Sequence, residues 1–247
     1  MKAMIFAAGL GTRLRPLTDA RPKALVEVGG TTLLERTLSR LREVGVRDVI
    51  INVHHFADMI AGYLSRNGNF GMRVELSREE ALLDTGGGLK KAAHFFLQEA
   101  SAARQPFFIH NVDVISTIDL DRMLRFHTEH QALAALAVQK RVSPRYLLFD
   151  QQQQLCGRQL GDDATEMVRP CEQAQRLAFS GIHVVSPNLL LRMTQTGAFS
   201  IIDTYLQLAA EGERIVAFRA DQYYWRDVGT PEHLKQAADE LARQGGA

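Results

Sequence analysis

Cysteine is scarce in this chain, which contains only Cys156 and Cys171. Two cysteines without metal-binding or redox spacing cannot supply a disulfide framework, and they indicate a reducing compartment. The eight histidines include no His-Glu-x-x-His spacing. Nothing in the sequence therefore predicts a zinc site.

Strong net charge and long apolar runs are lacking as well. The formal net charge is +1, and the basic residues near the start form a local group rather than a stripe, so no nucleic-acid surface is indicated. No apolar run is long enough to span a membrane, and no signal-peptide pattern is present. We therefore expect a soluble, cytoplasmic protein that binds neither nucleic acid nor membrane.

Strand-like apolar runs alternate with helical patterns along most of the chain. With 247 residues, of which 46% are apolar, the chain can form one large α/β domain or two small ones. The alternation predicts an α/β fold with a mostly parallel, mixed sheet that helices cover on both faces. The predicted strands include residues 3–8, 48–53, 72–76, 106–110, 132–139 and 178–185, and the predicted helices include 32–44, 56–64, 88–96, 120–127, 201–210 and 230–243. Residues 145–157 are predicted to form a hairpin.

The first predicted strand leads into a glycine-containing, basic stretch. Gly9 and Gly11 allow a tight turn whose N–H groups can converge on an anion, and Arg13 and Lys23 add positive charge. We interpret this stretch as a phosphate-handling loop at the carboxyl end of a strand, where open α/β sheets bind ligands. It is not a P-loop, which needs Gly-Lys-Ser/Thr, nor a dinucleotide fingerprint, which needs a third glycine. An ordinary strand-to-loop turn is the alternative.

Two aspartates follow strand-like or aromatic segments. Asp113 ends the string His-Asn-Val-Asp directly after the strand of residues 106–110, and Asp227 stands in Trp-Arg-Asp-Val-Gly-Thr-Pro before a helix start at Thr230. A carboxylate at a strand's carboxyl end faces the ligand crevice, and Mg²⁺ prefers a few carboxylates with phosphate oxygens and water. The alternative is that each aspartate only caps a turn or lies in an ordinary loop.

A third feature is the glycine run Leu-Leu-Asp-Thr-Gly-Gly-Gly-Leu at residues 82–89. Three glycines that enter a helix would let a flat base lie against the backbone, where main-chain groups could contact its edge. The alternative is a flexible loop with a helix N-terminus.

Together these motifs resemble those of the sugar-1-phosphate nucleotidylyltransferases. The most specific string is Ala-Ala-Gly-Leu-Gly-Thr-Arg-Leu-Arg-Pro-Leu-Thr at residues 7–18, followed by Pro-Lys at 22–23. The resemblance extends from residue 4 to residue 231 and implies a single Rossmann-like domain of the nucleotide-diphospho-sugar transferase type. Its parts would be a nucleotide-binding part at about 1–139, a sugar-binding part at about 140–220, and a metal-site segment with a helix at 221–247.

The resemblance also implies a reaction, in which a nucleoside triphosphate and a sugar 1-phosphate give an NDP-sugar and pyrophosphate. Arg13 would stabilise the leaving pyrophosphate, Lys23 would bind the α-phosphate and the sugar phosphate, and Asp113 and Asp227 would hold Mg²⁺. Val112 departs from the family, which usually has glycine there. The other residues implied are Ala7, Ala8, Gly9, Gly11, Thr12, Glu79, Thr85, Gly86, Gly87 and Asn111 for the nucleotide, and Ser180 and Gly181 for the sugar.

The chain looks most like short bacterial members acting on N-acetylmuramic acid 1-phosphate, mannose 1-phosphate or related sugars. UTP with N-acetylmuramic acid 1-phosphate is the first expectation, and GTP with mannose 1-phosphate or a heptose 1-phosphate is the second. A non-catalytic nucleotide-sugar sensor is an alternative on the same fold, and a cytidylyltransferase acting on a phosphorylated alcohol is another. The residues specify neither the base, the sugar nor the oligomeric state.

Overall fold

The computed structural model describes residues 1–98, 105–161 and 164–244. They form two compact units, and the chain passes from one unit to the other four times. The first unit contains Met1–Leu82, His110–Thr117 and the chain from Tyr224 onward, and the second contains Leu83–Ile109 and Ile118–Tyr223. This division follows packing and does not coincide with the boundaries near residues 139 and 220, which were drawn by expected function. The functional division stays a prediction.

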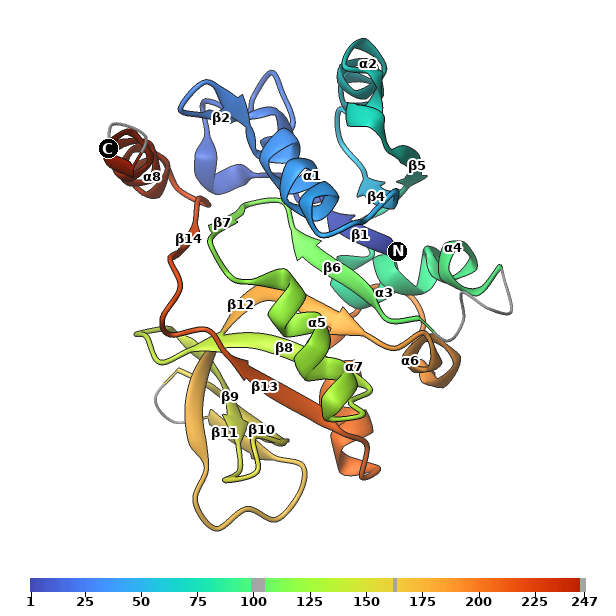
Figure 1. Ribbon diagram of the computed structural model, residues 1–247, viewed down its shortest axis with the longest axis vertical. Helices are drawn as coiled ribbons and strands as arrows, with labels where there is room; N and C mark the ends of the chain where they lie inside the picture. Colours follow the sequence, from blue (N-terminus) through green and yellow to red (C-terminus); the bar gives the residue numbers. More distant parts are fainter. Residues whose placement is uncertain (99–104, 162–163, 245–247) are drawn as a thin grey trace. The chain divides into compact units, whose positions relative to one another are not determined.

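Parallel strands form the centre of the first unit (Figure 1). β1 (Lys2–Phe6) pairs with β4 (Asp48–Val53), and β4 pairs with β5 (Arg73–Arg78). After their first residues β1 and β4 are buried throughout, as expected of parallel strands that are covered on both faces. Phe6 lies opposite Asn52, and Val53 lies opposite Arg78, so the segments that follow all three strands leave at one edge.

The first helix of this unit forms where the sequence predicts it. In α1 (Leu33–Glu43), the N-cap Thr32 accepts a hydrogen bond from the Glu35 N–H at 3.1 Å. Leu34, Leu38 and Leu41 recur at helical spacing, and all three are buried. A second helix of this unit, α2 (Ala57–Arg66), follows β4 in the sequence and precedes β5. Before α1, the short strands β2 (Glu27–Val28) and β3 (Thr31–Thr32) form a hairpin around two glycines with positive φ.

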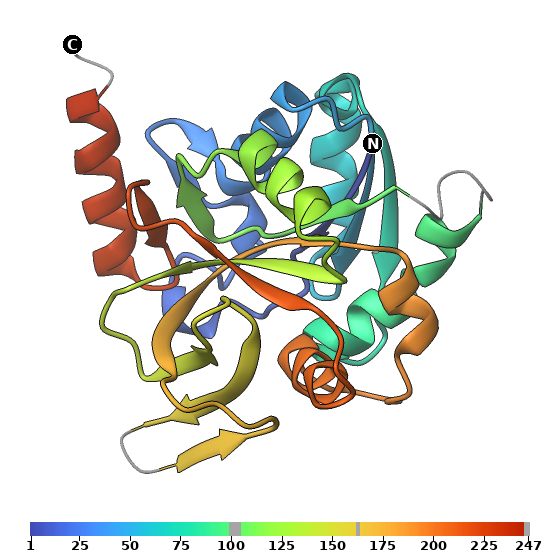
Figure 2. The same cartoon turned by 60° about the horizontal axis from the view of Figure 1, so that its bottom comes forward.

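Two short strands bring distant parts of the chain together in the first unit. β6 (Phe107–Asn111) ends in this unit, and β7 (Val114–Ser116) follows it. β7 pairs antiparallel with β14 (Trp225–Asp227), and α8 (Pro231–Gln244) follows β14. Figure 2 shows α8 next to β14. Arg226 of β14 donates to both carboxylate oxygens of Glu240 at 2.6 and 3.0 Å, so α8 is tied to β14.

Antiparallel pairing dominates the second unit. β8 (Ala134–Gln139) pairs antiparallel with β12 (Gln175–Val185) and parallel with β13 (Ile215–Arg219). The first residues of β12 pair with β9 (Arg145–Phe149), which continues through β10 (Leu155–Leu160) to β11 (Ala164–Met167) in an antiparallel series. The predicted hairpin at residues 145–157 is therefore confirmed, and its strands are visible in Figure 2.

The second unit also contains five described helices. They are α3 (Asp84–Lys91), α4 (Ala93–Leu97), α5 (Leu120–Glu129), α6 (Asn188–Arg192) and α7 (Ile201–Ala210). Asp119 caps α5 by accepting the Arg122 N–H at 2.8 Å. α3 begins at Asp84, four residues before the predicted start at residue 88, because the glycine run forms part of the helix itself.

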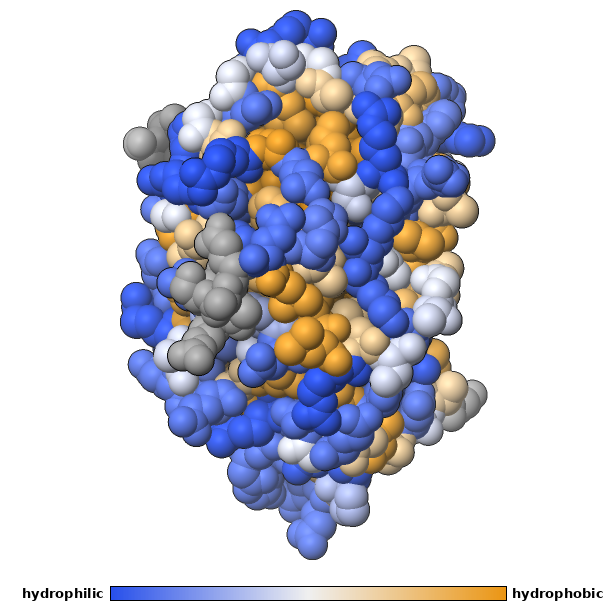
Figure 3. All heavy atoms as spheres, turned by 90° about the vertical axis from the view of Figure 1, so that its right-hand side faces the viewer, coloured by the Kyte–Doolittle hydropathy of each residue, from blue (hydrophilic) through white to orange (hydrophobic). Residues whose placement is uncertain are grey.

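The predicted α/β class with a mixed sheet is confirmed. The parallel pairs predicted from the first strands occur in the first unit, and the antiparallel pairs follow from the hairpins of the second. On the face drawn in Figure 3, hydrophobic residues form patches that hydrophilic residues interrupt. None of the helices in the described ranges has the length and apolar character needed to cross a membrane.

Candidate active site

The predicted phosphate loop follows β1 in the first unit. Ala7 and Ala8 continue the buried strand, and Gly9 is exposed, with open space where a side chain would stand. Gly11 has a φ of +65°, so the turn into the short 3₁₀ helix at Thr12–Leu14 requires glycine there. The Gly11 carbonyl accepts hydrogen bonds from the Leu14 N–H at 2.8 Å and from Thr18 Oγ1 at 2.9 Å. The stretch is therefore a closed turn rather than a loose loop.

Lys23 connects this loop to the first aspartate motif. Its side chain is one-tenth exposed, and its Nζ donates a hydrogen bond to Asp113 Oδ2. The Lys23 side chain also lies against Gly11, since a Cβ built on that glycine would stand 3.2 Å from Lys23 Cβ. A buried ammonium group needs a charged or polar partner, and Asp113 supplies it. Residues that are 90 positions apart in the sequence thus form one charged pair.

The β7–β14 pair brings the two predicted metal-binding aspartates to one place. Asp227 lies opposite Val114, the residue after Asp113, and the Val228 N–H donates to the Asp113 carbonyl at 2.9 Å. The Asp227 carboxylate accepts the Gly229 N–H at 2.5 Å, which fixes the side chain in the turn before α8. The segments that carry the two aspartates are therefore neighbours, and a metal shared by their carboxylates stays a prediction.

Arg13 reaches the same place from the phosphate loop. A Cβ built on Gly229 would stand 2.5 Å from Asp227 Oδ1 and 2.7 Å from Arg13 Nη2, so both charged groups border the α-carbon of this glycine. Gly229 therefore has to lack a side chain if Arg13 and Asp227 are to keep these positions. The first unit thus gathers four of the predicted site residues, namely Arg13, Lys23, Asp113 and Asp227.

A series of buried hydrogen bonds joins residues at the carboxyl ends of the parallel strands. The Ala7 N–H donates to Asn52 Oδ1 at 2.8 Å, and Asn52 Nδ2 donates to Glu79 Oε1 at 2.8 Å. Asn52 is 3% exposed and Glu79 is 5% exposed, so both side chains depend on these bonds. The sequence prediction included Ala7 and Glu79 and missed Asn52. The signal for it was a polar residue near the carboxyl end of an otherwise apolar buried strand.

Asn111 and its neighbours end β6. The side-chain oxygen of Asn111 is buried and has no hydrogen-bond partner among the described residues. His110 is buried, and burial is the main cause that lowers its pKa to about 4, so it is neutral near pH 7. Val112, which replaces the usual family glycine, is also buried and donates its N–H to the Phe6 carbonyl at 3.1 Å. The backbone at this position therefore continues the contact with β1 although a valine stands there.

The predicted base-binding glycines lie in the second unit, where they have a packing role that the sequence did not reveal. A Cβ built on Gly86 would stand 2.3 Å from the Phe199 ring, and one on Gly87 would stand 2.3 Å from the Gly197 carbonyl. The Gly86 N–H donates to the Phe199 carbonyl at 2.8 Å, and Thr85 Oγ1 accepts the Ile201 N–H at 3.0 Å. On the side that a Cβ would occupy, packing within the second unit therefore fills the space beside these two glycines. Nucleotide contacts by Thr85, Gly86 and Gly87 stay predictions.

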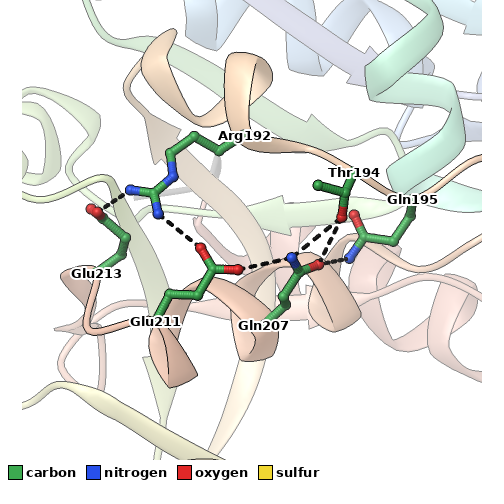
Figure 4. A network of polar contacts seen from close by, with 6 residues as sticks. All are labelled: Arg192, Thr194, Gln195, Gln207, Glu211 and Glu213. Atoms are coloured by element: carbon green, nitrogen blue, oxygen red, sulfur yellow. Dashed lines mark hydrogen bonds and ion pairs between the residues drawn. The ribbon is translucent and has the colours of Figure 1, made fainter.

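The segment that packs on these glycines joins α6 to α7, and side-chain hydrogen bonds hold it to α7. Figure 4 shows Gln207 of α7 in contact with Thr194, Gln195 and Glu211. Gln195 Nε2 donates to Gln207 Oε1 at 2.6 Å, and the Gln195 carbonyl accepts from Lys90 of α3. α3 and α7 are therefore held together within the second unit through the chain that joins α6 to α7.

Ser180 and Gly181, the predicted sugar-binding residues, lie in β12 and are buried. The pairing of β12 with β8 shifts register between Phe179 and His183, and Gly181 has a φ of +73°. These two residues thus lie where the strand pairing is irregular, with two more residues on β12 than on β8 between the flanking pairs. Their contact with a sugar stays a prediction.

Comparisons with known proteins identify the family to which this chain belongs. The model of the nucleotidyl transferase family matches residues 2–244. N-acetylmuramate alpha-1-phosphate uridylyltransferase of Caulobacter vibrioides is 32% identical over 97% of this chain and 96% of its own length. The catalytic subunit beta of mannose-1-phosphate guanylyltransferase of Danio rerio is 30% identical over 99% of this chain and 69% of its own length.

Solved structures show the same fold. HddC from Yersinia pseudotuberculosis complexed with GMP-PN aligns with a TM-score of 0.75 at 21% identity, over 97% of this chain and 99% of that one. UDP-glucose pyrophosphorylase complexed with UDP-glucose aligns with a TM-score of 0.77 at 17% identity, over 98% of both chains. The chain therefore belongs to the nucleotidyl transferase family and, within it, to the sugar-1-phosphate nucleotidylyltransferases.

Proposed function

We propose that this enzyme transfers a nucleotidyl group from UTP to N-acetylmuramic acid 1-phosphate and releases pyrophosphate. The observation that carries the proposal is the meeting of three sequence motifs in one unit, in which Lys23 pairs with Asp113 while Arg13 and Asp227 border Gly229. Arg13 and Lys23 are the cations that a triphosphate and a sugar phosphate need, and they lie beside the two carboxylates that would bind a cation.

The chemistry requires alignment and charge neutralisation more than proton transfer. An ionised oxygen of the sugar 1-phosphate attacks the α-phosphorus, and the bond from that phosphorus to the oxygen bridging to the β-phosphate breaks. The bridging oxygen leaves on pyrophosphate with the bonding electron pair, so no proton has to move. Lys23 would orient the α-phosphate and the attacking sugar phosphate, and Arg13 would stabilise the charge that develops on the leaving pyrophosphate.

Asp113 and Asp227 fit a Mg²⁺ site by their chemistry. Asp113 directly precedes β7, Asp227 ends the neighbouring strand β14, and the backbone bond from Val228 to Asp113 ties the two segments together. No group of three or more His, Cys, Asp or Glu in the described part of the chain could hold a metal. Two carboxylates that phosphate oxygens and water complete are a set that Mg²⁺ accepts. When bound, this ion would supply positive charge to the phosphate oxygens.

The choice of UTP and N-acetylmuramic acid 1-phosphate is supported by the Caulobacter relative, which matches this chain over almost its whole length. Several other relatives are named mannose-1-phosphate guanylyltransferases, which supports GTP with mannose 1-phosphate or a heptose 1-phosphate as the second candidate pair. In either case the enzyme would act in nucleotide-sugar biosynthesis.

The test is a pyrophosphate-release assay of the four nucleoside triphosphates against a panel of sugar 1-phosphates in the presence of Mg²⁺. We expect the highest kcat/KM for UTP with N-acetylmuramic acid 1-phosphate. Lys23→Ala should lose at least about 100-fold in kcat/KM, because a charge that acts in the transition state is removed. Lys235→Ala, which removes an exposed lysine on α8, is the matched control and should keep wild-type activity. Release of pyrophosphate without any sugar phosphate, or from none of the pairs, would contradict the proposal.

A further inference from the structure

Asn52 is a buried side chain that the proposed reaction does not use, yet it contacts two predicted nucleotide-binding residues. It lies near the end of β4, opposite Phe6 of β1 and Ser77 of β5. From this central position its amide reaches past the end of β1 on one side and past the end of β5 on the other. The two hydrogen bonds, to the Ala7 N–H and to the Glu79 carboxylate, are both 2.8 Å long and buried.

The network fixes the orientation of the Asn52 amide. The Ala7 N–H is a donor only, so it has to face the side-chain oxygen, and the Glu79 carboxylate accepts the side-chain NH₂ group. Glu79 is held from its backbone as well, because its N–H donates to the Val53 carbonyl at 2.8 Å and its carbonyl contacts His54 Nδ1 at 2.8 Å. One amide thus joins the start of the phosphate loop to a carboxylate whose main chain is already fixed.

We propose that Asn52 is a positioning residue that couples the phosphate loop to Glu79, so that the enzyme holds the two ends of the nucleotide in one geometry. This inference rests on the proposed function and adds to it that Ala7, at the start of the phosphate loop, lies with the phosphates and Glu79 with the base. Asn52 has no role with the sugar phosphate. Its loss therefore weakens binding of the nucleotide and leaves binding of the sugar phosphate unchanged.

Asn52→Asp is the sharpest perturbation, because it keeps the shape of the side chain and the acceptor for Ala7. It replaces the donor that faces Glu79 by a carboxylate oxygen, so two carboxylates oppose each other in a buried place. We expect the dissociation constant for UTP or GTP with Mg²⁺ to rise about 10- to 100-fold, the factor that matches the loss of one hydrogen bond to a charged group. The KM for the sugar phosphate should stay within about twofold of the wild-type value.

The double variant Asn52→Asp with Glu79→Gln is the decisive comparison. Glu79→Gln alone keeps the acceptor for Asn52, whereas in the double variant the new amide at position 79 donates to the carboxylate at position 52. We expect the double variant to bind nucleotide as well as Glu79→Gln alone, within about threefold. Independent roles would instead multiply the two losses. Asn67→Asp, an equal change of charge at an exposed residue after α2, is the control and should bind nucleotide normally.

Nucleotide binding is measured by calorimetry without sugar phosphate, so the result does not depend on turnover. If wild-type protein binds neither UTP nor GTP, both the proposed function and this inference fail. If it binds one of them and Asn52→Asp binds it equally well while folded, only the inference fails. If Asn52→Asp does not fold, the double variant still decides, since its donor and acceptor match. Nucleotide binding by the double variant that is more than about threefold weaker than binding by Glu79→Gln alone would overturn the coupling.

Discussion

Gly229→Ala should separate catalysis from stability at this site. The backbone of Gly229 is not in the left-handed region, so alanine is compatible with its conformation. The new methyl group would stand 2.5 Å from Asp227 Oδ1 and 2.7 Å from Arg13 Nη2, whereas ordinary contact begins at 3.4 Å. The two charged groups therefore have to move by about 0.9 and 0.7 Å (3.4 − 2.5 and 3.4 − 2.7) to make room.

The size of the effect follows from those displacements. A misplacement of about 1 Å in a catalytic group costs on the order of 100-fold in rate. Asp227 would move together with Arg13, so we expect kcat to fall about 100- to 1,000-fold. The free energy of unfolding should change by less than about 1 kcal/mol, because the displaced atoms are ends of flexible side chains and alanine restricts the unfolded chain.

The assay compares kcat, KM and thermal midpoint of Gly229→Ala with those of wild type. Gly62→Ala in α2 is the matched control, since its Cβ would meet only Arg66 Nη1 at an ordinary 3.5 Å. That variant should keep full activity. Wild-type kcat for a folded Gly229→Ala protein would refute the placement of Arg13 and Asp227 at the reacting centre. A loss of activity that parallels unfolding would show that Gly229 matters only for the fold.

Other predictions test the separate parts of the account. Arg13→Ala should lower kcat about 100- to 1,000-fold in steady-state assays while sugar-phosphate binding changes little, and near-normal turnover would remove Arg13 from the mechanism. Activity should vanish when EDTA removes the metal. The double variant Asp113→Asn with Asp227→Asn should lose much less turnover than the product of the two single losses, whereas multiplicative losses would exclude a shared ion. Gly87→Ala should lower the free energy of unfolding by about 1–3 kcal/mol in denaturant titrations, because its Cβ would overlap a backbone carbonyl at 2.3 Å; wild-type stability would contradict that packing. Burial lowers the pKa of His127 to about 4, below its unfolded value near 6.5, so the unfolded chain takes up the proton first and stability falls as the pH drops from 6.5 towards 4. Between pH 7 and pH 5, His127 should lower the free energy of unfolding of the wild-type protein by roughly 2 kcal/mol, and His127→Leu should abolish this part of the decrease. An unchanged dependence of stability on pH would show that His127 does not titrate this way.

The features that the sequence predicted well are local. The cap at Thr32 depends on residues three positions apart, and the turn at Gly11 depends on the conformational freedom of one residue. The β9–β10 hairpin is likewise set by neighbouring segments. Such features are encoded in short strings, and the aspartate motifs could be placed because each follows a strand or an aromatic segment directly.

The features that the sequence did not predict depend on contacts between distant segments. The packing of Gly86 and Gly87 against residues 197–199 joins segments that are more than 100 positions apart. The role of Asn52 depends on the register of three parallel strands, and no local pattern reveals which neighbours its amide meets. The two units also depend on long-range packing, since the chain leaves and re-enters the first unit twice.

The most direct test of the central claim follows the phosphorus atoms of the reaction itself. Wild-type protein is mixed with UTP, N-acetylmuramic acid 1-phosphate and Mg²⁺, and the products are resolved by ³¹P nuclear magnetic resonance. The account predicts equal amounts of pyrophosphate and of a nucleotide-sugar diphosphate, with both substrates consumed in the same proportion. The same spectrum for Lys23→Ala should show almost no product in that time. Formation of UMP or inorganic phosphate without the nucleotide sugar, or no reaction with either UTP or GTP and their candidate sugars, would contradict it.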